Sequence, residues 1–156
     1  KKPQPQKKNE LYALPPEMGG LVSLEFLDVN TNALTEIPST IGKLKSLKFL
    51  DIGYNHITKL PVEIAELEFL EELTIACNAE IKELPSLSYL RCLTSLNMAS
   101  LTIDHFPSDL QYLTNLTDLN ISSNHQVGHL PIELGFLEKL KKLDIHDNGL
   151  KNLPKE

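Results

Sequence analysis

The sequence predicts an α/β repeat solenoid, because leucine, asparagine and proline recur at a fixed period through most of its 156 residues. The positions that mark one unit are Leu44, Leu47, Leu50, Ile52, Asn55, Ile57, Leu60, Pro61 and Ile64. The next unit begins 23 residues later at Leu67, and further units begin at Leu21, Leu90, Leu113 and Leu137. This period indicates stacked units that share one core.

The repeats divide the chain into a tail and one repeat domain. Residues 1–8 (KKPQPQKK) lack the leucine positions, so we expect a polar, solvated tail there. The domain covers residues 9–156, with a partial repeat at 9–20, full repeats from 21, 44, 67, 90 and 113, and a truncated repeat from 137. The last unit has no cap, so we expect the natural chain to continue past Glu156 and this edge to self-associate end to end.

Each unit carries one short strand, in the order LDV, LDI, LTI, LNM, LNI and LDI. Alternate residues of a strand face opposite sides, so both apolar residues of each triplet point inward. One unit cannot bury them alone, and stacking therefore predicts a parallel sheet over an aliphatic core.

Asparagine and proline explain the rest of each unit. The asparagines that follow the strands should form a ladder of side-chain to backbone hydrogen bonds, and they are Asn32, Asn55, Asn78, Asn124 and Asn148. The prolines that stiffen the return segments are Pro15, Pro38, Pro61, Pro85, Pro107, Pro131 and Pro154. These segments are too short for long helices and should form short helical or 3₁₀ turns, or stay irregular.

The ladder is interrupted once, where Leu101 occupies the asparagine position. In the preceding unit, Asn78-Ala79-Glu80-Ile81 is one residue longer than Asn55-His56-Ile57, and the return segment that follows is one residue shorter. Either the repeat has drifted, or a local bulge shapes a binding edge.

These positions resemble those of the leucine-rich-repeat family over roughly residues 9–156. The L-P-x-x-I-x-x-L segment is similar to the intracellular Ras-group repeats of Ras-suppressor, scribble-type, Roco and plant proteins, and fungal adenylyl cyclases carry similar repeats. Val127-Gly128-His129-Leu130-Pro131 resembles a plant receptor repeat. The resemblance implies a leucine-rich-repeat horseshoe with a parallel concave sheet.

The residues between the inward leucines should line the concave face and bind a partner. We expect Phe26 and Phe49 to lie side by side, with Asp28 and Asp51 beneath them and Tyr54 at the rim. The remaining candidates on this face are Glu72, Thr74, Asn97, Asp118 and Asn120. Exposed aromatic rings beside carboxylates are typical of a hot spot for a partner with apolar and basic groups. The alternative is that the two rings only cover each other and the sheet.

The acidic run between residues 63 and 83 favours lateral ion-pair ladders between neighbouring units. Glu63, Glu66, Glu68, Glu71, Glu72, Glu80 and Glu83 form an acidic run. Several of them align with cations of neighbouring units, including Lys43 with Glu66, and Lys45 with Glu68 and Arg91. Such pairs contribute little at a surface, and the alternative is a basic ligand.

Composition limits the function classes. The net charge of −6 argues against nucleic-acid binding, which needs a basic face. No apolar run is long enough for a membrane span. Cys77 and Cys92 are too few for a disulfide framework, which favours a reducing, cytoplasmic location. The triplets at Asn115 and Asn120 match glycosylation sequons, which weakens that inference slightly.

The search for catalytic chemistry yields no candidate. The sequence has no phosphate-binding loop, dinucleotide fingerprint, nucleophile elbow or kinase motifs. His125 and His129 flank a glycine loop and do not have helical metal-ligand spacing. We therefore predict no enzyme activity, cofactor or metal.

Three functions remain open. The first is a protein-interaction module in intracellular signalling or scaffolding, for which the resemblance implies partners such as small GTPases. The second is a regulatory or sensor domain of a larger Roco GTPase, kinase or cyclase. The third is an extracellular receptor or adhesion fragment, which cysteine-capped ends would favour and this sequence lacks.

Overall fold

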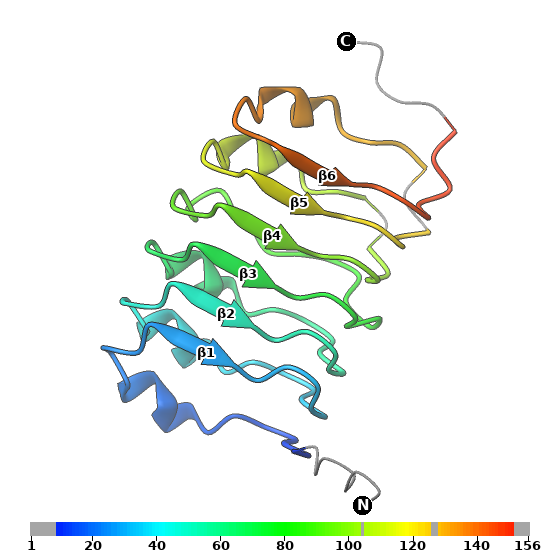
Figure 1. Cartoon of the computed structure of the whole chain (residues 1–156). Helices are drawn as coiled ribbons and strands as arrows, with labels where there is room; N and C mark the ends of the chain where they lie inside the picture. Colours follow the sequence, from blue (N-terminus) through cyan, green and yellow to red (C-terminus); the bar gives the residue numbers. More distant parts are fainter. Residues whose placement is uncertain (1–8, 104, 126–127, 152–156) are drawn as a thin grey trace, which may run out of the picture.

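A computed structural model describes residues 9–103, 105–125 and 128–151 of the chain. Six strands form one parallel sheet in chain order (Figure 1), and they are β1 (Phe26–Asp28), β2 (Phe49–Asp51), β3 (Glu72–Thr74), β4 (Ser95–Asn97), β5 (Asp118–Asn120) and β6 (Lys142–Asp144). The predicted parallel sheet is therefore confirmed. The predicted tail at residues 1–8 and the last residues, 152–156, lie outside the described part.

The strands pair in register, so equivalent positions of the repeats lie beside one another. Leu27, Leu50 and Leu73 are successive partners, and the same register continues to Leu143 in β6. These leucines face the core, where the inner strands bury them almost completely. Leu143 is 43% exposed because no described strand packs on the far side of β6.

Five return segments form 3₁₀ turns, as predicted: η1 (Pro16–Gly20), η2 (Ser39–Lys43), η3 (Val62–Glu66), η4 (Ser108–Tyr112) and η5 (Ile132–Phe136). Each follows a proline in extended conformation. The proline carbonyl accepts a hydrogen bond from the N–H three residues on, for example from Ile64 to Pro61 at 3.2 Å. That third residue is a buried or half-buried apolar residue that anchors the turn to the core.

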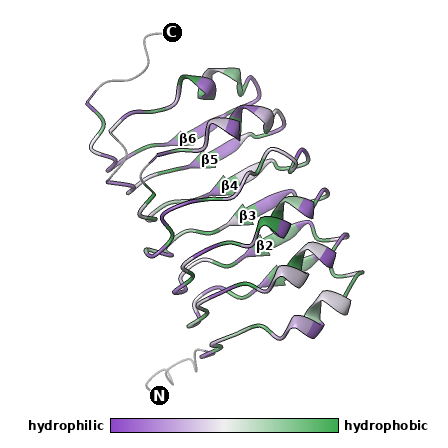
Figure 2. Cartoon of the chain, turned by 180° about the vertical axis from the view of Figure 1, so that it is seen from behind, coloured by the Kyte–Doolittle hydropathy of each residue, from purple (hydrophilic) through white to green (hydrophobic). Residues whose placement is uncertain are grey.

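The return segment before β4 has no 3₁₀ turn and stays irregular, which the prediction also allowed (Figures 1 and 2). The reason is its length. Four residues lie between Pro85 and Leu90, whereas five lie between Pro61 and Leu67. Leu87 is consequently only two residues after Pro85 and cannot close the three-residue hydrogen bond. Its N–H donates instead to the carboxylate of Asp109, at 3.0 Å.

The predicted asparagine ladder is confirmed. Asn55 is buried, and its Nδ2 donates to the carbonyls of Val29, Ile52 and Gly53. Its Oδ1 accepts the N–H of Leu34 in the preceding unit at 3.0 Å. Asn78 and Asn124 repeat this pattern with their own neighbours. The ladder therefore satisfies turn groups that would otherwise be buried without partners.

At Leu101 the ladder changes register. In the early units, the N–H that donates to an asparagine lies two residues after the asparagine of the preceding unit. Ile57, for example, lies two residues after Asn55 and donates to Asn78. In the later units the donor is the residue at the asparagine position itself, since the N–H of Leu101 donates to Asn124. The Leu101 side chain is buried in the core, and the extra residue before it is absorbed by a turn in which Ile81 N–H donates to the Asn78 carbonyl. The turn is therefore locally rebuilt, and its role in shaping a binding edge stays a prediction.

Candidate functional site

The predicted concave-face residues lie on one face of the sheet. Phe26 pairs with Phe49 across β1 and β2, and Asp28 pairs with Asp51. The two phenyl rings are stacked, with centroids 4.2 Å apart and planes 6° from parallel. Phe26 is 59% exposed and Phe49 is half-buried. The predicted side-by-side arrangement is confirmed, and it presents an aromatic surface to solvent.

The acidic residues below the rings also hold the turns. Asp51 Oδ1 accepts the N–H of Gly53 at 2.9 Å, and its Oδ2 accepts the Asn30 amide at 3.1 Å. Asp28 accepts the Asn30 N–H at 3.0 Å. Each carboxylate thus accepts from the N–H two residues on, a local side-chain to backbone turn. These residues were predicted only to bind a partner, and the structure adds this role in the turns.

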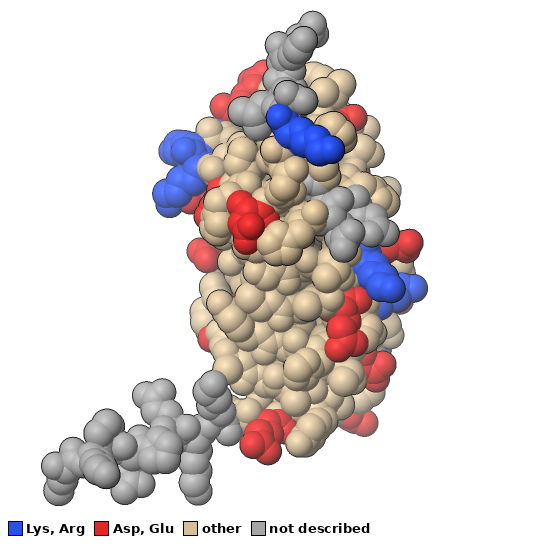
Figure 3. All heavy atoms as spheres, turned by 90° about the vertical axis from the view of Figure 1, so that its right-hand side faces the viewer, with Lys and Arg blue, Asp and Glu red and all other residues tan. Residues whose placement is uncertain are grey.

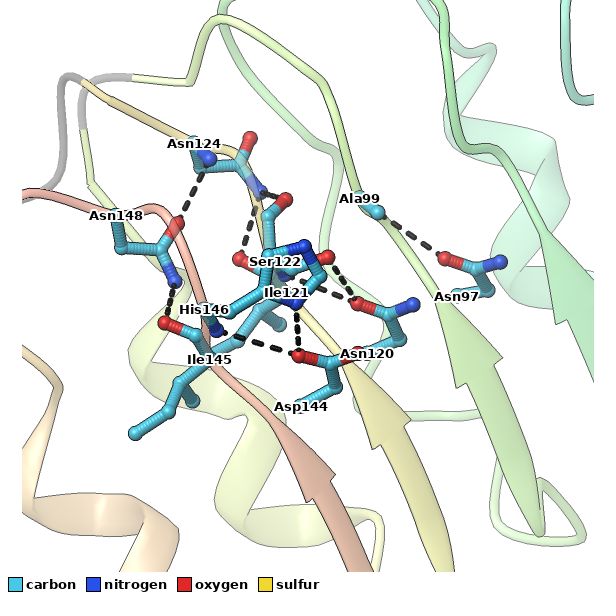
Figure 4. A network of polar contacts seen from close by, with 10 residues as sticks. All are labelled: Asn97, Ala99, Asn120, Ile121, Ser122, Asn124, Asp144, Ile145, His146 and Asn148. Atoms are coloured by element: carbon cyan, nitrogen blue, oxygen red, sulfur yellow. Dashed lines mark hydrogen bonds and ion pairs between the residues drawn. The ribbon is translucent and has the colours of Figure 1, made fainter.

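The same turn recurs along the row at Asn97, Asn120 and Asp144 (Figure 4). Asn120 Oδ1 accepts both the N–H and the hydroxyl of Ser122, the latter at 2.7 Å. Thr74 occupies the equivalent position in β3. Five of the six equivalent positions therefore accept a backbone N–H, and Thr74 is the exception.

Tyr54 lies where the chain leaves β2, and its side chain is 63% exposed. Its backbone is left-handed, with φ of 51°, an unusual conformation for an aromatic residue. The equivalent residue of every unit shares this conformation, namely Thr31, Cys77, Ser100, Ser123 and Asp147. The strained backbone is therefore a feature of the repeat. The neighbouring Cys77 thiol, chiefly through a hydrogen bond, raises the pKa of Tyr54.

The edge that contains Tyr54 carries little charge. Lys, Arg, Asp and Glu are absent from the turn of Asn30 to Thr35 and from the turn of Gly53 to Thr58, and the equivalent turn of the next unit, Ala76 to Ile81, contains one charged residue, Glu80. Figure 3 shows this edge, and uncharged residues cover most of its middle. Charge depletion is a property of the centres of protein interfaces.

Charge separates the two halves of the sheet face. The strand residues of β1 to β3 include the acids Asp28, Asp51 and Glu72 and no cation. In the other half, the carboxylate of Asp118 is 2.6 Å from Lys142 Nζ. That hydrogen bond, and a second from the Thr117 hydroxyl, lower the pKa of Asp118. The half around the stacked rings therefore has the more negative potential.

A hollow of about 650 Å³ lies on the other half of the face. Its lining includes Asn97, Asp118 and Asn120, together with Lys142 and Asp144. The ring of His146 lies 2.5 Å from Asp144 and, through this hydrogen bond, lowers the pKa of that carboxyl (Figure 4). This half offers polar hydrogen-bonding groups, in contrast to the aromatic half.

The predicted ion-pair ladders are partly wrong. Lys48 and Glu25, which occupy equivalent positions of adjacent units, form a lateral pair of the expected kind at 2.8 Å. Lys45, however, pairs with Glu66 at 2.8 Å and not with Glu68, because its long side chain reaches the carboxylate at the end of η3. Among the described residues, Arg91 has no carboxylate partner.

No group of three potential metal ligands occurs among the described residues. His125 Nδ1 lies 3.6 Å from Asp147, and both side chains are exposed. The two cysteines are free thiols. Within the described ranges, no helix is long and apolar enough to cross a membrane.

Sequence analysis missed the aromatic residues on the edge that precedes the strands. Phe69, Tyr89, Tyr112 and Phe136 are exposed there. Their spacing is a detectable signal, since Tyr89, Tyr112 and Phe136 each stand directly before a leucine that begins a unit.

Parallel stacking, inward leucines and the asparagine ladder define a solenoid of the horseshoe class, with an open sheet face. The chain belongs to the leucine-rich-repeat family: a model of a leucine-rich repeat region matches residues 40–156, and a single leucine-rich repeat matches residues 23–44. A comparison with curated proteins gives no match.

Solved structures agree with this assignment. An LRR protein of Leptospira interrogans is 31% identical with a TM-score of 0.66, and 96% of this chain aligns with 44% of that one. The leucine-rich repeat domain of the type III effector XopL is 27% identical with a TM-score of 0.83, and 97% of this chain aligns with 56% of it. An internalin from Listeria monocytogenes is 26% identical with a TM-score of 0.74, and 85% of this chain aligns with 38% of it. The chain thus spans about half the length of the first two.

Proposed function

We propose that the chain is a protein-interaction module whose sheet face binds a partner carrying apolar and basic groups. The observation that carries this proposal is the stacked pair of Phe26 and Phe49, exposed beside three carboxylates. Aromatic rings supply a large contact area, and fixed carboxylates favour a cationic neighbour. Proteins of this fold are generally non-catalytic binding modules.

The geometry supports a partner that crosses several strands. From the rings, the face continues past Glu72 and Thr74 to the polar row of Asn97 and Asn120. A partner with basic and apolar groups over β1 to β3, and polar groups over β4 and β5, would match both halves. Tyr54 extends this surface along the uncharged edge.

We further propose a cytoplasmic role in signalling or scaffolding, with a small GTPase or another signalling protein as the partner. The resemblance of segments such as Leu60 to Leu67 to Ras-group repeats supports this role. Binding of purified small GTPases, in both nucleotide states, would test it by interferometry. Absence of binding to all of them would contradict the choice of partner and leave the surface proposal intact.

The surface proposal can be tested with the double variant Phe26→Ala, Phe49→Ala. Wild-type protein would first select peptides from an array that varies basic and aromatic content. We expect it to select peptides with both, and the double variant to lose about tenfold or more in affinity, as hot-spot truncations do. Tyr112→Ala is the control, because it removes an exposed ring from a different edge. The proposal would be overturned if the selected peptides bound the Phe26→Ala, Phe49→Ala double variant as tightly as the Tyr112→Ala control.

A further inference from the structure

The break in the column of 3₁₀ turns opens a hollow on the edge opposite the asparagine ladder. The turns η1, η2 and η3 pack on one another in sequence, and η4 packs on η5. The turns η3 and η4 do not contact each other, since the unit between them has no turn (Figure 2). The hollow of about 710 Å³ lies between the end of η3 and the segment that leads into β4.

Close packing elsewhere shows what the missing turn would have filled. A Cβ at Gly42 would lie 2.8 Å from the Glu63 carbonyl of the next turn, so this position must be glycine. Ala65 is the equivalent residue of η3, and it lines the hollow because no turn stacks on it. Phe69, Tyr89 and Cys92 form further parts of the lining. We call this hollow the column gap.

The column gap is built to accept an apolar group. Phe69 is 59% exposed and Tyr89 is 65% exposed, and both rings line the same space. Pockets of about 300–1,000 Å³ with aromatic walls are typical of ligand sites. A large aliphatic or aromatic side chain of another molecule would bury these rings on docking.

The charges on the two walls of the column gap are opposite. Glu66 is already paired with Lys45 at 2.8 Å. Glu68, on the wall formed by the β3 unit, and Arg91, on the wall formed by the β4 unit, have no ion-pair partner among the described residues. Arg91 is also the only arginine in the sequence. A guanidinium binds a carboxylate with two parallel hydrogen bonds, whereas Glu68 favours a cation.

We propose that the column gap docks a short segment of a partner polypeptide, in which a large apolar residue lies between an acidic and a basic residue. The apolar side chain packs between Phe69 and Tyr89, the acidic residue pairs with Arg91, and the basic residue pairs with Glu68. This site is separate from the sheet face and does not depend on the function proposed for it.

Cys92 gives a direct test, because its exposed thiol belongs to the lining. In a Cys77→Ser background, blocked peptides with the core Asp-Leu-Lys would carry a linker that ends in a disulfide to mercaptoethanol. The Cys92 thiolate attacks this disulfide and releases mercaptoethanol, and excess mercaptoethanol keeps the exchange reversible. Mass spectrometry would measure the equilibrium yield of the mixed disulfide. Three control peptides differ only in this core. Asp-Ala-Lys lacks the large apolar side chain, Asn-Leu-Gln lacks the charges, and Lys-Leu-Asp reverses the order of the charges.

We expect the equilibrium yield of the mixed disulfide to be about tenfold higher for Asp-Leu-Lys than for Asp-Ala-Lys, because the leucine side chain is buried. The yield for Asp-Leu-Lys should also be about threefold higher than the yields for the neutral peptide Asn-Leu-Gln and the reversed peptide Lys-Leu-Asp, as expected for exposed ion pairs. Phe69→Ala with Tyr89→Ala should remove the preference for leucine. The swap Glu68→Arg with Arg91→Glu should invert the preference for charge order, and it alters only exposed side chains.

Two controls separate this site from the sheet face. Tyr112→Ala, at the position equivalent to Tyr89 one unit later, should leave all preferences unchanged, and so should Phe26→Ala with Phe49→Ala. Equal yields for the leucine and alanine peptides would overturn the proposal. A benzyl thiol disulfide that couples to Cys92 in the same yield as Asp-Leu-Lys would also overturn it, because the occupant would then not need to be a polypeptide. A charge swap that leaves the preference for charge order unchanged would overturn it as well.

Discussion

The Asp109 carboxylate accepts the hydrogen bond of the Leu87 backbone N–H at 3.0 Å, where other units use the carbonyl of a proline. The same oxygen accepts the Ser86 hydroxyl at 2.6 Å. One side chain of η4 therefore holds in place a segment that is too short to form its own turn. This contact fixes one side of the break in the column of turns.

Replacing Asp109 by Ala should destabilise the protein by about 1–3 kcal/mol, because the Leu87 N–H loses its acceptor in a part-buried site. Chemical denaturation would measure the loss, and hydrogen exchange should show faster opening at Leu87. Asp109→Asn retains an oxygen and should recover part of the stability. Thr40→Ala, at the equivalent position of an intact turn, is the control and should cost less. Equal losses at both positions would contradict the special role of Asp109.

Leu101→Asn tests the register change in the ladder. Because Leu101 is buried in the core, the amide should lose apolar packing and cost about 2–5 kcal/mol in unfolding free energy. Leu101→Met conserves volume and should cost less than about 1.5 kcal/mol. Unchanged or raised stability in the Asn variant would show that the new amide rejoins the ladder.

Asn55→Ala should be among the most destabilising single changes. It removes the acceptor of the Leu34 N–H and the donor to three carbonyls in a buried site. At about 1–3 kcal/mol for each buried group without a partner, the total should reach at least about 3 kcal/mol. Asn30→Ala, which removes one part-buried side-chain bond, is the matched control. Similar melting temperatures for both variants would refute the ladder as a main source of stability.

Phe49 and Leu50 are neighbours that face opposite sides, so their alanine variants should differ. Leu50→Ala should cost about 2–5 kcal/mol, since Leu50 is fully buried. Phe49→Ala removes a half-buried ring together with its stacking on Phe26, so it should cost about 1–2.5 kcal/mol, less than Leu50→Ala. Urea denaturation of the two variants gives both values. Equal costs would mean that the ring pair stabilises the fold and does not primarily serve a partner.

Lys142→Met should raise the pKa of Asp118 toward its ordinary value, because the Lys142 hydrogen bond is the main cause that lowers it. A lowered carboxyl pKa stabilises the fold at pH values above the unfolded pKa, and this contribution is lost as pH falls through the folded pKa. The variant should therefore lose less stability than wild type on acidification below about pH 4. Carbon-detected NMR titration of the carboxyl measures the shift. Lys141→Met should change it little, and equal effects of the two variants would contradict the assignment.

The repeat pattern was enough to predict the strand positions, their parallel register, the leucine core, the asparagine ladder and the pairing of Phe26 with Phe49. These features repeat, and a repeated local pattern places equivalent side chains beside one another whenever the units stack. Strand alternation then assigns Leu50 to the core and Phe49 to the open face.

Features that depend on contacts between different positions of neighbouring units could not be predicted from the repeat pattern and are seen only in the folded chain. The contact of Asp109 with Leu87, the pairing of Lys45 with Glu66 and the burial of Leu101 each depend on how a particular turn bends. The hollow between Phe69 and Tyr89 exists because one return segment is a residue too short for its turn, and the units on either side cannot close over it. A periodic pattern predicts what is shared among repeats, whereas the irregular unit takes its structure from its neighbours.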